Sequence, residues 1–316
     1  MMKILITGAS GFVGGSFLKR FSDQEGIEIH GISRRPMPWD NYSQVDLSKG
    51  IDIDFKPDVV IHAAAHVSPW GSKKTFFEGN ILSTENVIDF CEKNGHPKLI
   101  YISSSSVFYH DKPQFDITEN SPIGPDFIND YAATKYAGEQ CIQKYSGKKV
   151  ILRPRAIFGP GDEVLFPRIL KAAEKGKLPL FTTQEPVIGD LIYIDCLTDY
   201  MLFAAQSDSI QGDYNLTNDK PIEIQAVLLS VLSRLGYPQP KKKVSMKTAM
   251  RLAGIVEWCY RAFNIKNEPP ITRYGVSVLA NSKTFDVTKM LTDFGPPSMT
   301  IEQGIENFIQ WELENV

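Results

Sequence analysis

Tyr131 and Lys135 are the residues of this sequence best suited to proton transfer. They stand at positions i and i+4 of the stretch 130–139, which is predicted to be helical, so their side chains share one face. A phenol titrates at about 10, too high for a base at neutral pH. A nearby ammonium stabilises the phenolate and lowers that pKa, and Tyr131 is therefore predicted to exchange a proton with a substrate oxygen.

This spacing of tyrosine and lysine is common by chance, and two further pairs have it. The pair that begins at Tyr237 spans two prolines and cannot be helical. The pair that begins at Tyr145 crosses a glycine at the end of a helix. Only Tyr131 and Lys135 lie inside a sustained helix, which favours a catalytic pair over a solvated surface pair.

Four serines, Ser103–Ser106, end a buried strand predicted over residues 98–103. Open sheets of parallel strands bind their ligands at the carboxyl ends of the strands. The hydroxyls of this cluster are therefore expected beside the substrate oxygen, where they can share the proton that Tyr131 transfers.

The chain begins with a strand, a glycine turn and a helix, predicted over residues 3–7, 8–11 and 12–21. Amides at a helix N-terminus hold a pyrophosphate, and glycines let the backbone approach it. The spacing GxxGxxG departs from the general dinucleotide fingerprint, and a purely structural turn is the alternative. The cofactor residues predicted here are Gly8, Ser10, Gly11, Phe12, Val13 and Gly14.

The second strand, predicted over residues 27–33, ends in Ser33, Arg34 and Arg35. A carboxylate at this place selects NAD, whereas arginine accommodates the additional phosphate of NADP. No carboxylate is present, so NADP is favoured and NAD is the second choice. A solvated basic turn is the alternative interpretation.

Two further strands are predicted over residues 45–47 and 57–65, the second of them apolar and buried on both faces. Asp46 and the adjacent Leu47 are predicted to meet the adenine, although an aspartate here is equally typical of a turn. The small residues Ala63, Ala64 and Ala65 leave room for the cofactor beside the glycine turn, unless they serve close packing alone. A long helix is predicted over residues 72–94.

Composition excludes several classes of function. The net charge of −3 in 316 residues favours neither nucleic acid nor an anionic membrane as a partner. The four cysteines show no paired spacing, which is typical of a reduced, cytoplasmic protein. His62 and His66 are separated only by alanines, so no metal site is expected. We expect neither a signal peptide nor a transmembrane segment.

The alternation of strands and helices predicts an α/β fold, a doubly wound parallel Rossmann sheet with a smaller, mostly helical C-terminal substrate lobe. The predicted dinucleotide-binding domain covers residues 1–162, with returning segments at about 189–217 that include strands over 190–194 and 214–216. The lobe and the C-terminal helices cover residues 163–188 and 218–316, beginning with a helix over 164–175. A homodimer is expected.

Several of these motifs occur together in one order: the glycine turn, the alanine run, Asn80, the serines, the Tyr131 pair and the stretch 152–162. In this the chain resembles the extended short-chain dehydrogenase/reductases over nearly its whole length. The resemblance implies a serine, tyrosine and lysine catalytic set, in which Ser104 is the serine and Ser105 the second choice. It also implies that Asn80 and Lys135 serve the cofactor and that Pro154 and Ile157 contact the nicotinamide.

The second half should select the substrate, and residues 246–263 form one apolar stripe there. Core or dimer packing, the wall of an apolar substrate pocket and contact with a membrane surface are the alternatives for it. Stretches 69–71, 166–169 and 269–273 resemble the 3β-hydroxysteroid dehydrogenases and the bacterial 2-alkyl-3-oxoalkanoate reductases. An apolar small-molecule substrate is therefore expected. A nucleotide-sugar 4-epimerase or reductase is the second choice, and a regulator that binds NADP without turnover is the third.

Overall fold

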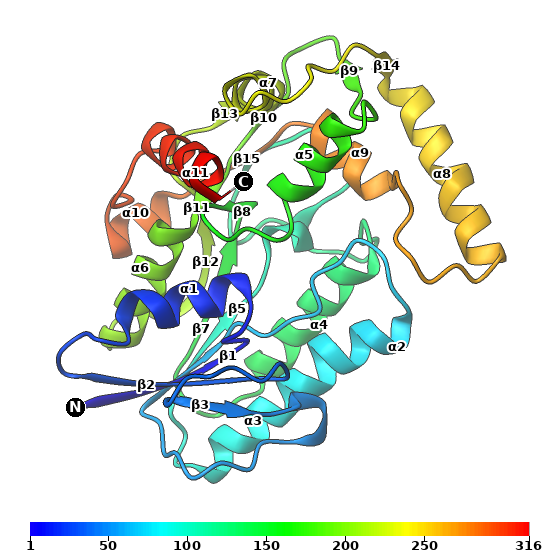
Figure 1. The fold of residues 1–316 in the computed structure, drawn as a ribbon. Helices are drawn as coiled ribbons and strands as arrows, with labels where there is room; N and C mark the ends of the chain where they lie inside the picture. Colours follow the sequence, from blue (N-terminus) through cyan, green and yellow to red (C-terminus); the bar gives the residue numbers. More distant parts are fainter. Residues whose placement is uncertain (316) are drawn as a thin grey trace.

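A seven-stranded parallel sheet organises the fold, as seen in a computed structural model of which residues 1–315 are described here (Figure 1). All six pairings between neighbouring strands are parallel. This confirms the doubly wound Rossmann sheet that the alternation of elements predicts. The strand order is β3 (Tyr42–Gln44), β2 (Ile27–Ser33), β1 (Met2–Thr7), β4 (Val59–His62), β5 (Lys98–Ile102), β7 (Lys149–Pro154) and β12 (Gly212–Leu216).

Helices cover both faces of the sheet, because successive side chains of a strand point to opposite faces. Ile4 and Ile6 of β1 pack with Phe17 in one apolar cluster, on the face that α1 and α6 cover. Leu5 packs with Ile142 in a second cluster, on the face that α3 and α4 cover. The helices are α1 (Phe12–Phe21), α6 (Ile194–Gln206), α3 (Ser83–Lys93) and α4 (Asp130–Gln143).

The prediction of a strand over residues 45–47 was wrong. The third strand is β3, and Leu47 instead begins a short 3-10 helix, η1 (Leu47–Lys49). The Asp46 carboxylate accepts hydrogen bonds from the amide of Ser48 at 3.2 Å and from its hydroxyl at 2.8 Å. Asp46 therefore caps a turn, which is the conformation that short polar side chains favour over a strand.

The long helix predicted over residues 72–94 is divided into three segments. They are α2 (Lys73–Phe76), a π-helical segment η2 (Phe77–Leu82) and α3. The wider turn of the π segment carries Asn80, which is buried. Similarly, the strand predicted over residues 190–194 is only β11 (Ile192–Tyr193), after which α6 begins at once.

The smaller lobe is assembled from segments that lie far apart in the sequence. Helix α8 lies at its outer edge and packs against α9, while α5 faces the large domain (Figure 1). A mixed sheet, in the order β13, β10, β15, β6, joins the lobe to the loop that follows β5. These elements are α5 (Phe166–Glu174), β9 (Leu180–Thr182), α7 (Ile224–Arg234), β14 (Lys243–Ser245), α8 (Met246–Ala262), α9 (Arg273–Ala280), β13 (Ile222–Glu223), β10 (Ile188–Gly189), β15 (Lys283–Phe285) and β6 (Gln114–Ile117).

The last two helices return to the large domain. Helix α10 (Thr288–Phe294) packs against β12, and α11 (Ile301–Asn315) packs against α7 and β11. Strand β11 pairs in turn with β8 (Ile157–Phe158) beside the end of β7. Among residues 1–315, none of the helices has the length and apolar character needed to cross a bilayer.

Helix α4, which carries Tyr131, lies very close to the sheet at Gly138. A Cβ added at this position would collide with the phenol oxygen of Tyr101 and would lie 3.2 Å from the carbonyl oxygen of Asn80. Backbone and a buried ring cannot yield easily, so glycine is required for this approach.

We therefore expect Gly138→Ala to lower the free energy of unfolding by about 1–3 kcal/mol, the usual cost of overpacking, despite the better helix propensity of alanine. Chemical denaturation measures this. Gly275→Ala in α9 is the control, because the nearest atom to its added Cβ is a side-chain hydroxyl at 3.3 Å. Equal stabilities of wild type and Gly138→Ala would contradict the close seating of α4.

Candidate active site

One cavity of about 1110 Å³ extends from the carboxyl edge of the large sheet to the smaller lobe. All residues predicted to bind the cofactor or to catalyse line this cavity, except Asn80 and Lys135. The predicted residues in the wall are Gly8, Ser10, Gly11, Phe12, Val13, Gly14, Ser33, Arg34, Arg35, Asp46, Leu47, Ala63, Ala64, Ala65, Ser104, Tyr131, Pro154 and Ile157.

The glycine turn is packed too tightly for any other residue. A Cβ on Gly14 would lie 2.5 Å from the carbonyl oxygen of Gly8, and one on Gly8 would lie 2.9 Å from the backbone of Ala64. Gly8 also has a positive φ of 72°. Helix α1 begins after Gly11 without a side-chain cap, so the amides of its first turn are available to an anion. The turn therefore fits the pyrophosphate of a dinucleotide.

The end of β2 lies beside this turn. The hydroxyl of Ser33 contacts those of Ser10 at 2.6 Å and Tyr42 at 2.7 Å. The Arg35 guanidinium also turns toward Ser10, with Nε 3.2 Å from its hydroxyl. Arg34 is exposed, and within residues 1–315 its side chain makes no hydrogen bond or ion pair. Arg34 is thus the cation available to an additional phosphate on the cofactor ribose. Tyr42, which the sequence analysis did not indicate, is a neighbour of Ser33.

Tyr131 lies in the first turn of α4, where the Asn129 side chain caps the helix by accepting from the amide of Ala132 at 2.8 Å. Burial raises the pKa of Tyr131, Tyr274 raises it further, and a hydrogen bond from Ser104 lowers it. The predicted lowering by Lys135 is not among these effects, and the Lys135 ammonium instead donates to the carbonyl oxygen of Ile102. The protein groups alone therefore keep the Tyr131 phenol protonated.

Lys135 is almost fully buried between α4 and the sheet. Its ammonium donates to the carbonyl oxygen of Ile102 at 2.7 Å and lies 4.0 Å from the centre of the Tyr101 ring. Burial lowers the pKa of Lys135 to about 7, while the charge of Glu139 raises it. The side chain is close to the balance between its charged and neutral forms at neutral pH.

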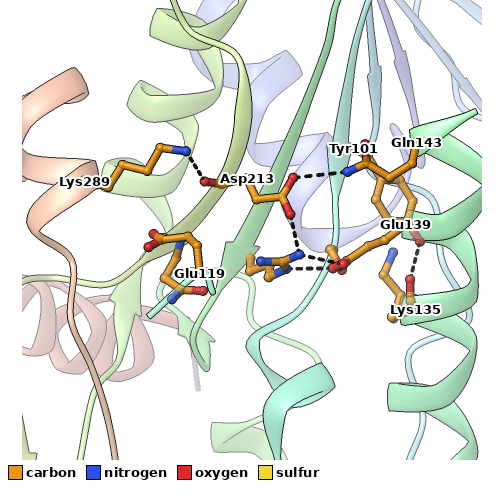
Figure 2. Close-up of polar contacts among 10 residues, drawn as sticks. Tyr101, Glu119, Lys135, Glu139, Gln143, Asp213 and Lys289 are labelled. Carbon is orange, nitrogen blue, oxygen red and sulfur yellow. Dashed lines mark hydrogen bonds and ion pairs between the residues drawn. The ribbon is translucent and has the colours of Figure 1, made fainter. Parts of the chain in front are cut away.

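A buried ion pair lies one turn further along α4, and the charge of its carboxylate, Glu139, favours the charged form of Lys135 (Figure 2). Glu139 accepts two hydrogen bonds from Arg153 of β7, at 2.9 and 2.8 Å, and a third from the hydroxyl of Ser103. Arg153 also reaches Asp213 of β12 at 2.7 Å. The carboxylate that faces Lys135 is thereby fixed to the two strands at the edge of the sheet.

Asn80, which was predicted to serve the cofactor, does not line the cavity. Its side chain accepts from the amide of His66 at 2.6 Å and donates to the hydroxyl of Thr134 at 3.0 Å. It therefore ties the loop after β4 to α4, close to Tyr131. The nearby His62 is buried between Thr7 and Thr84, and burial lowers its pKa to about 3, so its ring is neutral.

The part of the cavity in the smaller lobe has a largely apolar wall. Helix α8 contributes to it through Ala249 and Leu252, whereas Ala253 packs against Phe181 in the core of the lobe. Trp258 of the same helix is exposed. The stripe thus serves both core packing and the cavity wall. Other apolar residues of this wall are Leu165, Ile169, Phe181, Val244, Pro270, Ile271, Val276, Val278 and Leu279.

Tyr109, Arg155 and Tyr274 are among the polar residues of the wall that the sequence did not single out. Arg155 is 4% exposed and follows Pro154 directly. The only signal for it was its position between Pro154 and Ile157. The tyrosines come from segments whose approach to the cavity depends on how the lobe folds.

A Rossmann sheet with a glycine turn, and a cavity holding Tyr131 and Ser104 beside it, defines the class of dinucleotide-dependent oxidoreductases of the short-chain type. Residues 4–217 match the NAD dependent epimerase/dehydratase family. The chain belongs to this family, and it is an NAD(P)-dependent enzyme of the short-chain dehydrogenase/reductase type.

Relatives with assigned activities span nearly the whole chain. A 2-alkyl-3-oxoalkanoate reductase of Stenotrophomonas maltophilia is 30% identical over 96% of this chain and 97% of its own length. A decarboxylating sterol-4-alpha-carboxylate 3-dehydrogenase of Mus musculus is 26% identical over 98% of this chain and 90% of its own. A UDP-glucuronic acid 4-epimerase of Bacillus cereus, solved with NAD, has the same fold, with a TM-score of 0.73 at 21% identity over 99% of both chains.

The buried pair behind α4 gives a stability prediction. Arg153→Met should lower the free energy of unfolding by about 3–5 kcal/mol, because it leaves the Glu139 carboxylate buried without its partner. Denaturant titration measures the loss. The double variant Arg153→Met/Glu139→Met removes both charges and should recover much of it. A single variant as stable as wild type would mean that Glu139 does not need this counter-charge.

Proposed function

We propose that the protein catalyses reversible hydride transfer between NADP and a secondary alcohol or ketone of an apolar substrate, either a β-hydroxy or β-oxo acyl compound or a 3β-hydroxysteroid. The observation that carries the proposal is the single cavity that joins the glycine turn, Ser104 and Tyr131 to the apolar wall of the smaller lobe. The names of the two relatives support it, since both describe oxidation or reduction at an oxygen-bearing carbon.

Tyr131 is the proposed acid and base. Its phenol, kept protonated by burial, gives a proton to the carbonyl oxygen during reduction and takes one from the alcohol during oxidation. Ser104 orients that oxygen, since its hydroxyl lies close enough to Tyr131 to lower the tyrosine's pKa. Bound NADP supplies or accepts the hydride and, when oxidised, a positive charge that favours the phenolate.

Lys135 is proposed to act from behind this pair. Its ammonium holds the carbonyl of Ile102, at the end of the strand from which the serines emerge. Its second proposed role, in the charged form, is a contact with the ribose of the bound cofactor. Glu139 favours that charged form against the cost of burial.

The cofactor preference rests on the end of β2. Ser33 and Arg35 border the glycine turn, and Arg34 is an exposed cation without a protein partner in residues 1–315. Neither Asp nor Glu stands among these three positions to pair with a ribose diol. NADP is therefore the proposed cofactor, with NAD as the alternative.

The proposed substrate lobe is formed by residues 163–188 and 218–285. A nucleotide-sugar 4-epimerase is the second candidate, and the shared fold with the Bacillus cereus epimerase is the observation that favours it. Competition by UDP would support that candidate, whereas an acyl or steroid alcohol as substrate supports the first. Dimerisation and a cytoplasmic location remain predictions from the sequence.

Tyr131→Phe should reduce turnover by about 10²- to 10⁴-fold, the usual contribution of a general acid and base, while cofactor affinity changes little. The reaction is followed by nicotinamide absorbance with a panel of β-hydroxy acids, hydroxysteroids and sugar nucleotides. Tyr136→Phe in the same helix is the control, because Tyr145, the other choice, donates a buried hydrogen bond to Pro97 at 2.6 Å. Near-normal turnover by Tyr131→Phe would refute the assignment.

Arg34→Ala should remove most of a preference for NADP over NAD, about 10- to 100-fold in dissociation constant, because a guanidinium contact with phosphate is charge-assisted. The affinity for NAD should stay nearly unchanged. Lys19→Ala, which removes an exposed cation from α1, controls for net charge. Equal affinities of the wild-type protein for NAD and NADP would show that Arg34 is only a solvated surface charge.

A further inference from the structure

In the part of the chain that the structure describes, Arg155 is a buried cation without a hydrogen-bond or ion-pair partner, and it lies in the wall of the candidate active-site cavity. It is 4% exposed, and its Nε is buried without a hydrogen-bond partner. Within residues 1–315 the rest of the guanidinium makes no hydrogen bond or ion pair either. Buried charges in folded proteins are normally paired, because desolvation of an isolated ion is costly. An arginine left in this state is poised for an anion that comes from outside the chain.

The neighbouring groups of Arg155 leave this charge uncompensated. Its guanidinium lies 5.2 Å from the centre of the Tyr109 ring, an attractive contact that does not neutralise it. Asp190 is the nearby buried carboxyl, but it accepts the amide of Phe285 at 2.9 Å and does not line the cavity. Burial raises the pKa of Asp190 to about 6, with Arg155 acting against that rise. Lys283 is a second buried cation whose pKa Arg155 helps to lower.

The backbone fixes Arg155 next to the expected reaction centre. It follows Pro154, the last residue of β7, and its amide donates to the carbonyl of Leu216 at 3.0 Å. Ala156 then adopts a positive φ of 39°, which turns the chain before Ile157. Arg155 therefore stands between the two residues predicted to contact the nicotinamide.

Tyr274 connects this arginine to Tyr131. It lines the cavity, burial raises its own pKa while the charge of Arg155 acts against that rise, and it raises the pKa of Tyr131. One phenol is thus within electrostatic reach of both the proposed proton donor and the unpaired cation. Tyr131 and Arg155 line the same cavity, so one substrate can present its reacting oxygen to Tyr131 and a second, anionic group to Arg155.

We propose that Arg155 binds the carboxylate of a substrate that carries it on the carbon next to the reacting carbon, a free β-hydroxy or β-oxo acid. This rests on the proposed function and deepens it, because it selects the free acid over its ester or thioester. The fork of a guanidinium matches a carboxylate with two parallel hydrogen bonds. The bound acid would supply the counter-charge that the chain omits, and its alkyl part would occupy the apolar wall.

The test compares a 2-alkyl-3-hydroxyalkanoic acid with its methyl ester as substrates for oxidation. Arg155→Met should lower kcat/KM for the acid by about 10- to 100-fold, the range of a charge-assisted contact, and leave the ester within about threefold. Arg155→Lys should retain part of the preference for the acid. Arg168→Met, which removes a cavity arginine already paired with Glu268 at 3.1 Å, should keep the acid-to-ester ratio.

A binding measurement separates this inference from the proposed reaction. Calorimetry with an unreactive 2-alkylalkanoic acid should show binding to wild type that Arg155→Met weakens by a similar factor, with no change for the methyl ester. Equal losses for acid and ester, or a matching loss of NADP affinity, would overturn the role of Arg155. A wild type that oxidises neither compound would refute the acyl form of the proposed function, and the calorimetric comparison would still decide whether Arg155 holds a carboxylate.

Discussion

The burial of charge between α4 and the sheet is the constraint on which the site depends. Lys135 can remain partly charged there only because Glu139 faces it, and Glu139 is stable only because Arg153 satisfies it (Figure 2). Removal of Arg153 would leave the Glu139 carboxylate desolvated and without its counter-charge. The helix that carries Tyr131 is thereby held to β7 by paired ions and to β5 by the close approach at Gly138. The position of the Tyr131 phenol therefore depends on contacts between α4 and the sheet.

The sequence predicted the elements whose signal is local. Apolar runs and glycines placed α1 and β2 at their observed bounds and β1 to within one residue, because each feature depends on side chains within a few positions. The sequence-based prediction failed where a single side chain decides between two local structures. Asp46 prefers to cap a turn, which removed the predicted third strand. The π-helical turn around Asn80 arises from tertiary contacts to His66 and Thr134, which no periodicity reveals.

The candidate site was predictable to a similar degree. Motif residues converge on one cavity because parallel strands end at the same edge. The direction of Lys135 was not predictable, since the spacing of Tyr131 and Lys135 gives a shared helix face but not the depth of each side chain. The positions of Arg155 and Tyr274 in the cavity wall could be recognised only in the folded structure, because they depend on how the smaller lobe packs at the end of β7. Their significance lies in unpaired charge, which is a property of the folded state.

The smaller lobe has an apolar core of its own, in which Phe181, Ala249, Ala253 and Val276 pack together, apart from the two clusters that flank the large sheet. Ala249, Phe181 and Val276 also line the cavity. Substitutions of these three residues would therefore change the space for a substrate and the packing of the lobe together. Laboratory evolution aimed at substrate selectivity would therefore begin with these residues, and each substitution would have to keep the core of the lobe filled while it reshapes the cavity wall.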